Sequence, residues 1–551
     1  MQDVNVQKSS KKSLLGFKRG YFWILGFIIS ACGAKTNKDL EVENKIGFAE
    51  DYVPPNSNFD DKIQMTEDPN FKILEPMLLE PYWVKALSMS DAETVLDELL
   101  SNHNQTLYFS FPKEAPHYIP VTINGWAPAG DSIIEASREI FTNLEQVLNI
   151  EFREMPSADG LNNLAISQSI QVASSGFSYY PNNIFQLGSD IFIDKDFAQP
   201  TVLTGGLTNY DYEVLIHEIG HALGLKHPFE ADRTNNMVLN EYEDYTKFTA
   251  MSYDSDFETF DGTFRSLDWM TLTKFYGVNP EYRSDNDTYT FDDMTGKFII
   301  DGNGIDAIKC PSSVQDIFID LRPGTHSYEG SKSDYITSPR QLTISHGSEI
   351  ENVETGSGAD IIIGNQLSNT IQSGDGDDKI FAGEGMDIVH PSGGQDIIDL
   401  SEDIGVADTL VIEKNNEDNY DIIYGFAQGM LGDVLDFSDF NLTGKTILPI
   451  VNIENVPFGY IDSCLVKIFG EALDNAQSVK ASFSSFGSLE NLKLSSGQEA
   501  LLITAASQET GEAQNIYSIE NKSGFVDVLH VTQLVGNYLD IDNWSADNFV
   551  V

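Results

Sequence analysis

Three histidines and a glutamate lie close together in residues 217–228, which read HEIGHALGLKHP. His217 and His221 are four residues apart, so a helix through this segment directs both imidazoles at one ion. Gly224 permits the left-handed turn that ends a helix, and the returning chain can add His227 as a third ligand. Three neutral imidazoles leave the fourth tetrahedral position of zinc for a water molecule, whose acidity the metal raises.

Glu218 directly follows the first of these histidines. Its carboxyl group is placed to accept the proton of the water as the water attacks a carbonyl carbon, and then to pass that proton to the departing amine. The predicted chemistry is therefore zinc-assisted hydrolysis of an amide. Chance explains the pattern poorly, because three histidines, a glutamate and a glycine at these places are expected on the order of 10⁻⁵ times per random chain.

The histidines require a helix, and residues 212–223 are predicted to form it, capped by Thr208, Asn209 or Asp211. Helical spacing also occurs in two segments upstream, and alternating or β-branched residues predict four strands. The helical segments are 90–100 and 131–150, and the strands are 106–112, 163–168, 175–181 and 189–195. Together they indicate an α+β, or α/β-layered, catalytic domain.

The spacing HExxHxxGxxH resembles the metzincin signature, and Pro228 after it resembles the serralysin family within that group. The resemblance covers roughly residues 88–283. Serralysins carry a methionine turn after the zinc helix, and FTAMSYDSD (248–256) resembles it, with Met251 as the apolar floor beneath the metal. The resemblance implies that Tyr253 ligates zinc in the resting enzyme and swings away to hydrogen-bond the oxyanion of the tetrahedral intermediate.

Two further segments resemble serralysins. SGFSYYP (175–181) looks like the edge strand along which these peptidases pair an extended substrate, because unpaired backbone groups at an edge can bind a peptide. LDWMTLTKFYGVNP (267–280) resembles the helix that closes their catalytic domain. The resemblance implies a metalloendopeptidase that acts on protein or peptide substrates.

A nine-residue repeat begins at Gly356. Aspartate or asparagine recurs at each ninth residue, and an aliphatic side chain follows two places later, at Ile362, Ile371, Ile380, Val389 and Ile398. The pattern matches the G-G-x-G-x-D-x-U-x repeat of RTX proteins, whose parallel β-roll binds calcium in its turns. Glycines permit the turns and expose carbonyl oxygens, aspartates supply anionic ligands, and the aliphatic residues fill the interior.

The repeat predicts a set of calcium ligands. They are Gly356, Gly358, Asp360, Gly374, Gly376, Asp378, Gly383, Gly385, Asp387 and Asp396. If two nonapeptides make one coil, Asp360, Asp378 and Asp396 stack on one side, while Asn369 and Asp387 face the other. The second unit lacks the glycines and carries Asn369 instead of an aspartate, so we expect good calcium sites on the first side and weaker sites opposite.

The amino-terminal residues resemble a lipoprotein signal peptide. Five basic residues precede the apolar stretch 21–31 (YFWILGFIISA), which is too short to span roughly 30 Å of hydrocarbon. Residues 29–32 resemble the bacterial lipobox, whose cysteine becomes the lipid-modified first residue of the mature protein. We expect an extracellular or cell-surface protein that is anchored to the bacterial outer membrane through lipid on Cys32. The ending DNFVV (547–551) resembles a type I secretion signal, although a last strand is the preferred interpretation.

Length and charge limit the other expectations. The chain has 551 residues, with 33 basic and 85 acidic side chains and a net charge of −52. This surplus argues against nucleic-acid partners, because phosphates would be repelled, and it favours an environment rich in cations. We expect a monomer. The predicted parts are a signal peptide (1–32), a tether and N-terminal extension (33–87), the catalytic domain (88–283), an RTX β-roll domain (284–440) and a further all-β region (441–551).

Two functions remain open. The first is a lipid-anchored zinc endopeptidase stabilised by calcium, where zinc is inferred from three histidines and the family. The alternative is a calcium-dependent surface-binding or adhesive lipoprotein with a vestigial peptidase domain. Every catalytic position is filled, which favours the first. Cys310 and Cys464 could pair or could be small core residues.

Overall fold

The computed structural model describes strand β1 (Ile29–Cys32), most of residues 81–440, and separate segments between 442 and 550. The gaps within 81–440 are residues 102, 173, 197–206, 233, 256–261, 403–405, 415–419 and 429–431. The predicted signal segment before Ile29, residues 33–80 of the predicted tether, and Cys464 lie outside the described residues. Within the described residues, no helix is both long and apolar enough to cross a lipid bilayer.

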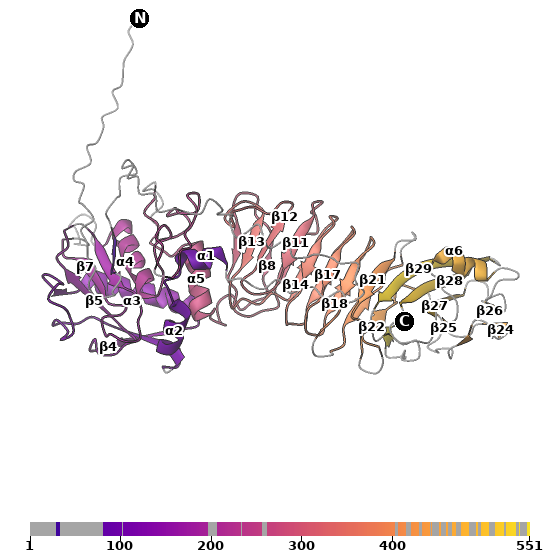
Figure 1. Cartoon of the computed structure of the whole chain (residues 1–551), viewed down its shortest axis with the longest axis horizontal. Coiled ribbons are helices and arrows are strands. Elements are labelled where there is room, and N and C mark those ends of the chain that lie inside the picture. The colour runs from indigo at the N-terminus through magenta and orange to yellow at the C-terminus, as the bar shows by residue number, and fades with distance from the viewer. Residues whose placement is uncertain are drawn as a thin grey trace, which may run out of the picture.

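A mixed sheet and five helices form the first part of the structure (Figure 1). The helices are α1 (Tyr82–Leu87), α2 (Ala92–Ser101), α3 (Asp131–Val147), α4 (Asn209–Ala222) and α5 (Ser266–Tyr276). The strands that join β1 are β2 (Thr106–Ser110), β3 (Ala127–Pro128), β4 (Glu151–Met155), β5 (Asn163–Ser169), β6 (Gly176–Tyr179) and β7 (Ile191–Asp194). The sheet order is β1-β6-β7-β5-β2-β4, with β3 beside β5. The helix predicted at 131–150 and the four predicted strands are all present in this α+β arrangement.

An aromatic stack attaches helix α3 to the sheet. The ring of Phe141 lies 4.5 Å from that of Phe109 on β2 and 4.8 Å from that of Phe152 on β4. All three side chains belong to one buried core, which also contains the apolar residues of α4. Burial of such a side chain contributes roughly 1.5–3 kcal/mol, so the stack fixes the layer against which the histidine helix packs.

Strand β1 occupies the outer side of β6. The two strands are antiparallel, and their partners run from Ile29 opposite Tyr179 to Cys32 opposite Gly176. On its inner side, β6 pairs antiparallel with β7. The segment expected to be a free edge for substrate is therefore covered by the chain itself in this structure.

Two sheets made mostly of parallel strands form the second part, to the right of the helices in Figure 1. One sheet contains β8 (Thr288–Tyr289), β10 (Ala307–Lys309), β14 (Asn352–Glu354), β16 (Thr370–Gln372), β18 (Ile388–His390), β20 (Thr409–Val411) and β22 (Val434–Asp436). The other contains β9 (Lys297–Ile299), β11 (Ile317–Asp320), β12 (His326–Glu329), β13 (Gln341–Ile344), β15 (Ile361–Ile363), β17 (Lys379–Phe381), β19 (Ile397–Asp399) and β21 (Asp421–Tyr424). From β14 to β22 the strands are parallel and alternate between the two sheets, which is the parallel β-roll that the repeat predicts. Before them, β12 pairs antiparallel with β11 and β13.

The repeat aliphatics form the interior of the roll. Ile362 pairs with Ile380, and Ile380 pairs with Ile398, in successive parallel strands of one sheet. Ile371 pairs with Val389 in the other sheet. All five side chains are fully buried. The two-residue offset from each aspartate therefore places every aliphatic side chain inside.

A buried cluster joins the first part to the roll. The hydroxyl of Tyr82 on α1 donates to Glu243 Oε2 at 2.7 Å, and Thr337 Oγ1 of the roll donates to Glu243 Oε1 at 3.0 Å. Glu243 is completely buried. A buried carboxylate is costly unless it is hydrogen-bonded, so this contact ties the loop after His227 to both neighbours.

Strands from the carboxyl-terminal region continue both sheets of the roll. Strand β29 (Phe525–Val535) pairs in parallel with β21, and β30 (Phe549–Val550) pairs in parallel with β22. Further strands extend beyond β29, namely β28 (Gln514–Lys522), β27 (Glu499–Ala505), β25 (Leu465–Phe469) and β23 (Val451–Asn452). The remaining described elements there are β24 (Gly459–Tyr460), β26 (Leu492–Lys493) and α6 (Ala476–Ser482). Phe549 and Val550 of the ending DNFVV thus form a strand, which agrees with the preferred interpretation, while Asp547 and Val551 lie outside the described residues.

Packing inside the roll predicts a large difference between two similar substitutions. Ile380→Ala, in the interior, should lower the stability of the calcium-loaded protein by about 2–5 kcal/mol, because it leaves a cavity. Ile388→Ala, on the next strand along the chain and in the other sheet, is the matched control, because Ile388 is 41% exposed. Denaturant unfolding followed by circular dichroism measures both, and equal losses would contradict this description of the interior.

Candidate metal centres

Helix α4 begins and ends at residues that fix its histidines. Thr208 is the N-cap, with its Oγ1 accepting from the backbone N–H of Asp211, and Asp211 Oδ2 accepts from Thr208 N in return. This capping box favours a helix start at Asn209, three residues before the predicted start. The helix ends at Ala222, and Gly224 follows with a φ of +103°, as expected of a residue that reverses the chain.

The three predicted histidine ligands converge in the structure. His227 Nε2 lies 3.2 Å from His217 Nε2 and 3.2 Å from His221 Nε2. Tetrahedral zinc with bonds of about 2.0–2.1 Å separates its nitrogen ligands by roughly 3.3 Å. The side chains are 2%, 0% and 3% exposed in chain order, so solvent does not separate them. Of the described residues, this is the one cluster in which histidine, cysteine, aspartate or glutamate atoms converge closely enough for a shared ion.

The other ring nitrogen of each histidine has an acceptor. His217 Nδ1 lies 2.8 Å from Ala250 O, His221 Nδ1 lies 2.7 Å from Leu225 O, and His227 Nδ1 lies 3.2 Å from Glu230 Oε2. Because each acceptor favours a proton on Nδ1, Nε2 keeps its lone pair. Three lone pairs that face one another repel, and a shared cation relieves that repulsion. The donor set therefore fits zinc.

Burial keeps the first two histidines neutral. Burial, together with the neighbouring His227, lowers the pKa of His217 to about 3, while the hydrogen bond to Ala250 O opposes the shift. Burial likewise holds the pKa of His221 well below its ordinary value. Neutral imidazole is the form that ligates metal.

Tyr253 lies beside the histidine cluster, and Met251 lies against helix α4. The hydroxyl of Tyr253 lies 2.8 Å from His227 Nε2, and its ring stacks on that of His217 at 5.6 Å. Met251 is fully buried below α4, and a side chain added at Gly220 would meet Met251 Sδ at 2.7 Å. Met251 thus lies against the backbone of the histidine helix, between the two helical ligands.

Asp268 on α5 supports the methionine turn, and the sequence did not reveal this role. Its carboxylate accepts from Thr249 Oγ1 at 2.6 Å and from Ala250 N at 2.7 Å, and it is completely buried. Ala250 O is in turn the acceptor for His217 Nδ1. A chain of contacts therefore runs from α5 to His217, the first of the three predicted ligands.

Lys226 is a second supporting residue that sequence reasoning missed. It is 1% exposed, and its ammonium group lies within hydrogen-bonding distance of four backbone oxygens. These are Ala86 O at 2.7 Å, Glu230 O at 2.8 Å, Met237 O at 2.9 Å and His227 O at 3.3 Å. The contacts hold the segment after His227 against helix α1. Residues before the predicted domain boundary at 88 therefore help to shape the site.

Glu218 is held between α4 and β6. Ser178 Oγ lies 2.8 Å from Glu218 Oε2, whereas Glu218 Oε1 is buried without a hydrogen bond among the described residues. Burial raises the pKa of Glu218 to about 8, and the hydrogen bond from Ser178 opposes that shift. A raised pKa brings a carboxylate closer to the range useful for a general base near neutral pH.

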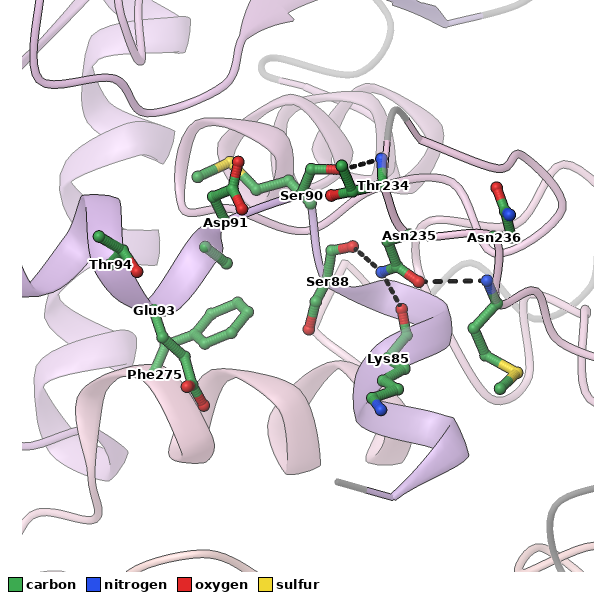
Figure 2. Close-up of a pocket in the computed structure, with 13 residues that line it drawn as sticks. Lys85, Ser88, Ser90, Asp91, Glu93, Thr94, Thr234, Asn235, Asn236 and Phe275 are labelled. Carbon is green, nitrogen blue, oxygen red and sulfur yellow. Dashed lines mark hydrogen bonds between the residues drawn. The ribbon is translucent and has the colours of Figure 1, made fainter. Parts of the chain in front are cut away.

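A separate cavity of about 490 Å³ is lined by residues of α1, the start of α2, residues 234–237 and Phe275. Figure 2 shows Asn235 at its wall, where the side-chain amide donates to Lys85 O at 2.7 Å and Ser88 O at 2.8 Å. None of the predicted site residues lines it. The cavity is therefore distinct from the histidine cluster.

The repeat aspartates form hydrogen-bonded ladders. Asp360 N donates to Asp378 Oδ1 and Asp378 N to Asp396 Oδ1, both at 2.8 Å, across 18 residues. On the other side, Asn369 N donates to Asp387 Oδ1 at 2.7 Å. The Oδ2 atoms of these aspartates are buried and make no hydrogen bond of ordinary geometry within the described residues. Buried anionic oxygens that lack a donor suit a hard cation such as calcium.

The structure supports only part of the predicted difference in calcium sites between the two sides of the roll. Asn369 has its amide group satisfied by Glu351 O and Asn365 Oδ1, so this position offers no anionic oxygen. However, the same side continues from Asp387 to Asp408 and from Asp408 to Asp433. The first side continues from Asp396 to Asp421. These three aspartates were missed because they follow their neighbours by 21 or 25 residues, not 18.

The predicted glycines lie where close backbone contacts exclude a side chain. Gly374 and Gly376 have positive φ, and a Cβ on either would lie 2.0 Å from a carbonyl oxygen of the previous coil, Gly356 O or Gly358 O. Gly383 and Gly385 likewise have φ of +103° and +113°. The coils therefore approach each other through their backbones at these turns.

A carboxylate pair at the start of the roll was also missed. Asp301 and Asp306 flank the glycine-containing turn DGNGID and are 0% and 1% exposed. Asp301 Oδ1 and Asp306 Oδ2 are buried without a hydrogen-bond partner among the described residues. The turn resembles a repeat unit in composition, but it stands alone and therefore gave no periodic signal.

These buried carboxylates predict an unusual dependence of stability on pH when calcium is absent. Burial raises the pKa of Asp378, Asp396 and Asp408 to about 8, and that of Asp387 to about 7. The value in an unfolded chain is about 3.9. Because the folded form binds protons more tightly, their contribution is fully present below about pH 4 and is lost as the pH rises through 7 to 8.

The unfolding temperature of the calcium-free roll should therefore fall by about 5 °C or more between about pH 5 and about pH 8. Calcium should abolish the fall, because it takes the place of the protons. Asp378→Asn should reduce the fall without calcium, since it removes one of the titrating groups. Thermal scans at several pH values, with calcium or a calcium-selective chelator, measure these effects. A calcium-free roll that becomes more stable as the pH rises would contradict the prediction.

The family described as RTX calcium-binding nonapeptide repeat (4 copies) matches residues 363–398. This range contains strands β16, β17 and β18 and reaches into β15 and β19. The chain therefore carries RTX calcium-binding repeats, which confirms the interpretation of the nine-residue pattern.

Three curated proteins show what else the chain is similar to. It is 30% identical over 279 residues to Serralysin of Proteus mirabilis, covering 43% of this chain and 55% of that protein. It is 28% identical over 301 residues to Serralysin of Photorhabdus laumondii, covering 48% and 60% respectively. It is 29% identical over 259 residues to Metallopeptidase AprA of Pseudomonas marginalis, covering 41% and 52%. The chain spans little more than half the length of these relatives, and over that span it is serralysin-like.

Proposed function

We propose that the chain is a zinc-dependent endopeptidase of the serralysin type, with a metzincin catalytic domain and a calcium-stabilised β-roll. The observation that carries this proposal is the convergence of three Nε2 atoms within a buried site, next to a glutamate with one oxygen left without a donor. Similarity to proteins named Serralysin and Metallopeptidase AprA supports it. We also propose the division into domains that the sequence predicts, except that helix α1 is counted as part of the catalytic domain.

His217, His221 and His227 would hold the zinc ion, which would supply Lewis acidity toward a water molecule and a substrate carbonyl. Glu218 Oε1 then accepts the proton that the water loses as its oxygen bonds to the carbonyl carbon. Glu218 returns this proton to the amide nitrogen, and the carbon–nitrogen bond breaks to give an acid and an amine. The Tyr253 hydroxyl donates to the oxygen that gains negative charge.

Glu218→Ala should retain zinc and the fold, and should lower casein cleavage by at least about 10²-fold to 10⁴-fold, because it removes the proton acceptor. Metal analysis, circular dichroism and a casein assay test the three parts together. A wild-type protein that is purified with zinc but cleaves neither casein nor a peptide library would refute the peptidase. That result would favour the surface-binding lipoprotein with a vestigial peptidase domain.

We further propose an extracellular or cell-surface location, with a lipid anchor on Cys32, and a monomer that acts on proteins and does not bind nucleic acid. The apolar stretch and the lipobox-like residues 29–32 support the anchor. Cleavage before Cys32 would separate residues 29–31 from the mature chain. Because these residues cover the outer side of β6, their loss would leave its backbone groups available to an extended substrate.

Cys32→Ser should abolish incorporation of labelled fatty acid, because the thiol is the proposed acceptor. Cys310→Ser is the matched control and should keep the label, since Cys310 lies in the roll as a free, half-buried thiol. Metabolic labelling followed by electrophoresis measures both. An unlabelled wild-type protein would contradict the lipobox interpretation.

A further inference from the structure

Strand β6 touches the proposed general base through a side chain. Ser178 is completely buried, and its hydroxyl lies 2.8 Å from Glu218 Oε2 and 2.9 Å from Glu218 O. A hydroxyl has one proton to donate, and Glu218 acts as a base in its charged form, in which the carboxylate is a stronger acceptor than a backbone oxygen. The hydroxyl therefore donates to Oε2, with the backbone oxygen as a weaker second acceptor.

The second oxygen of Glu218 is left for chemistry. Oε1 is buried and has no hydrogen-bond partner among the described residues. Gly176, two residues before Ser178, makes room for it, because a Cβ there would lie 2.9 Å from Glu218 Cγ and 3.0 Å from Oε1. Strand β6 thus occupies one carboxylate oxygen and leaves space around the other.

The strand is well placed to hold this geometry. It is paired with β7, where Ser178 is opposite Ile191 and Gly176 is opposite Ile193. Both isoleucines are buried in the catalytic core. Because the backbone of β6 is fixed by these pairs, the direction of the Ser178 hydroxyl is fixed as well.

We propose that Ser178 is a positioning residue, which holds Glu218 by Oε2 so that Oε1 faces the water, while Gly176 supplies the space for that orientation. The inference rests on the proposed peptidase function. A carboxylate that is already oriented does not have to reorganise during proton transfer, so the benefit falls on kcat and not on substrate binding.

Ser178→Ala should lower kcat about tenfold to a hundredfold with little change in KM, because one charge-assisted hydrogen bond is lost. Ser178→Thr keeps the hydroxyl and should restore most of kcat. Ser189→Ala is the matched control. Ser189 Oγ also donates to the backbone of α4, at Ala222 O and 2.8 Å, but it does not touch Glu218. The Ser189→Ala variant should therefore keep kcat within about threefold of the wild-type value.

A binding measurement separates positioning from structural support. A peptide that ends in a hydroxamate gives up its proton to a nearby base when it binds zinc. Ser178→Ala should weaken this affinity about tenfold when Glu218 is present, and should have no effect in a Glu218→Ala background. Zinc content and the unfolding midpoint, measured on the same samples, should stay at wild-type values.

Three results would overturn the positioning role while the peptidase function stands. They are an active wild type with an unchanged Ser178→Ala, equal losses in Ser178→Ala and Ser189→Ala, and a hydroxamate effect that persists without Glu218. A zinc-loaded wild type without peptidase activity would overturn the proposed function, and this inference with it.

Discussion

The backbone N–H of one repeat aspartate or asparagine donates to Oδ1 of the repeat aspartate one coil further along, and the roll depends on this contact. It fixes the register of the coils, and with it the pairing of the interior aliphatic side chains. It also uses one oxygen of each carboxylate and leaves the second oxygen buried. Stacked carboxylates repel one another, so the folded roll needs protons or cations to compensate. Register and cation binding are therefore two results of one hydrogen bond.

The histidine centre follows the same physical logic. Each imidazole has two nitrogens, and the protein satisfies Nδ1, which leaves Nε2 for a metal. The carboxylate of Glu218 has two oxygens, and Ser178 engages Oε2, which leaves Oε1. In each case the chain determines the reactive atom by occupying its neighbour. In the histidine centre and in the roll alike, a hydrogen bond to one atom of a side chain leaves its second atom available to a metal ion or a proton.

The sequence predicted the parts of these sites that depend on local spacing. His217 and His221 share a helical face, Gly224 reverses the chain, and the repeat aspartates recur at a constant interval. Asp268, Lys226 and Ser178 could not be predicted in the same way, because each reaches the site from another element and no local rule gives that distance. Asp408, Asp421 and Asp433 give no periodic signal, because they follow their neighbours by 21 or 25 residues instead of 18. The pairing of β1 with β6 depends on tertiary structure alone.

Strands β29 and β30 each add to one sheet of the roll after its last repeat strands. A parallel roll that stopped at β21 and β22 would present two rows of unpaired backbone groups, and a coil from a second molecule would fit them as well as its own next coil does. Because non-repeat strands cover both rows, the repeat strands β21 and β22 do not themselves offer a template for end-to-end growth. The length of the roll at this end is therefore set by the chain itself, and not by association between molecules, which would depend on protein concentration.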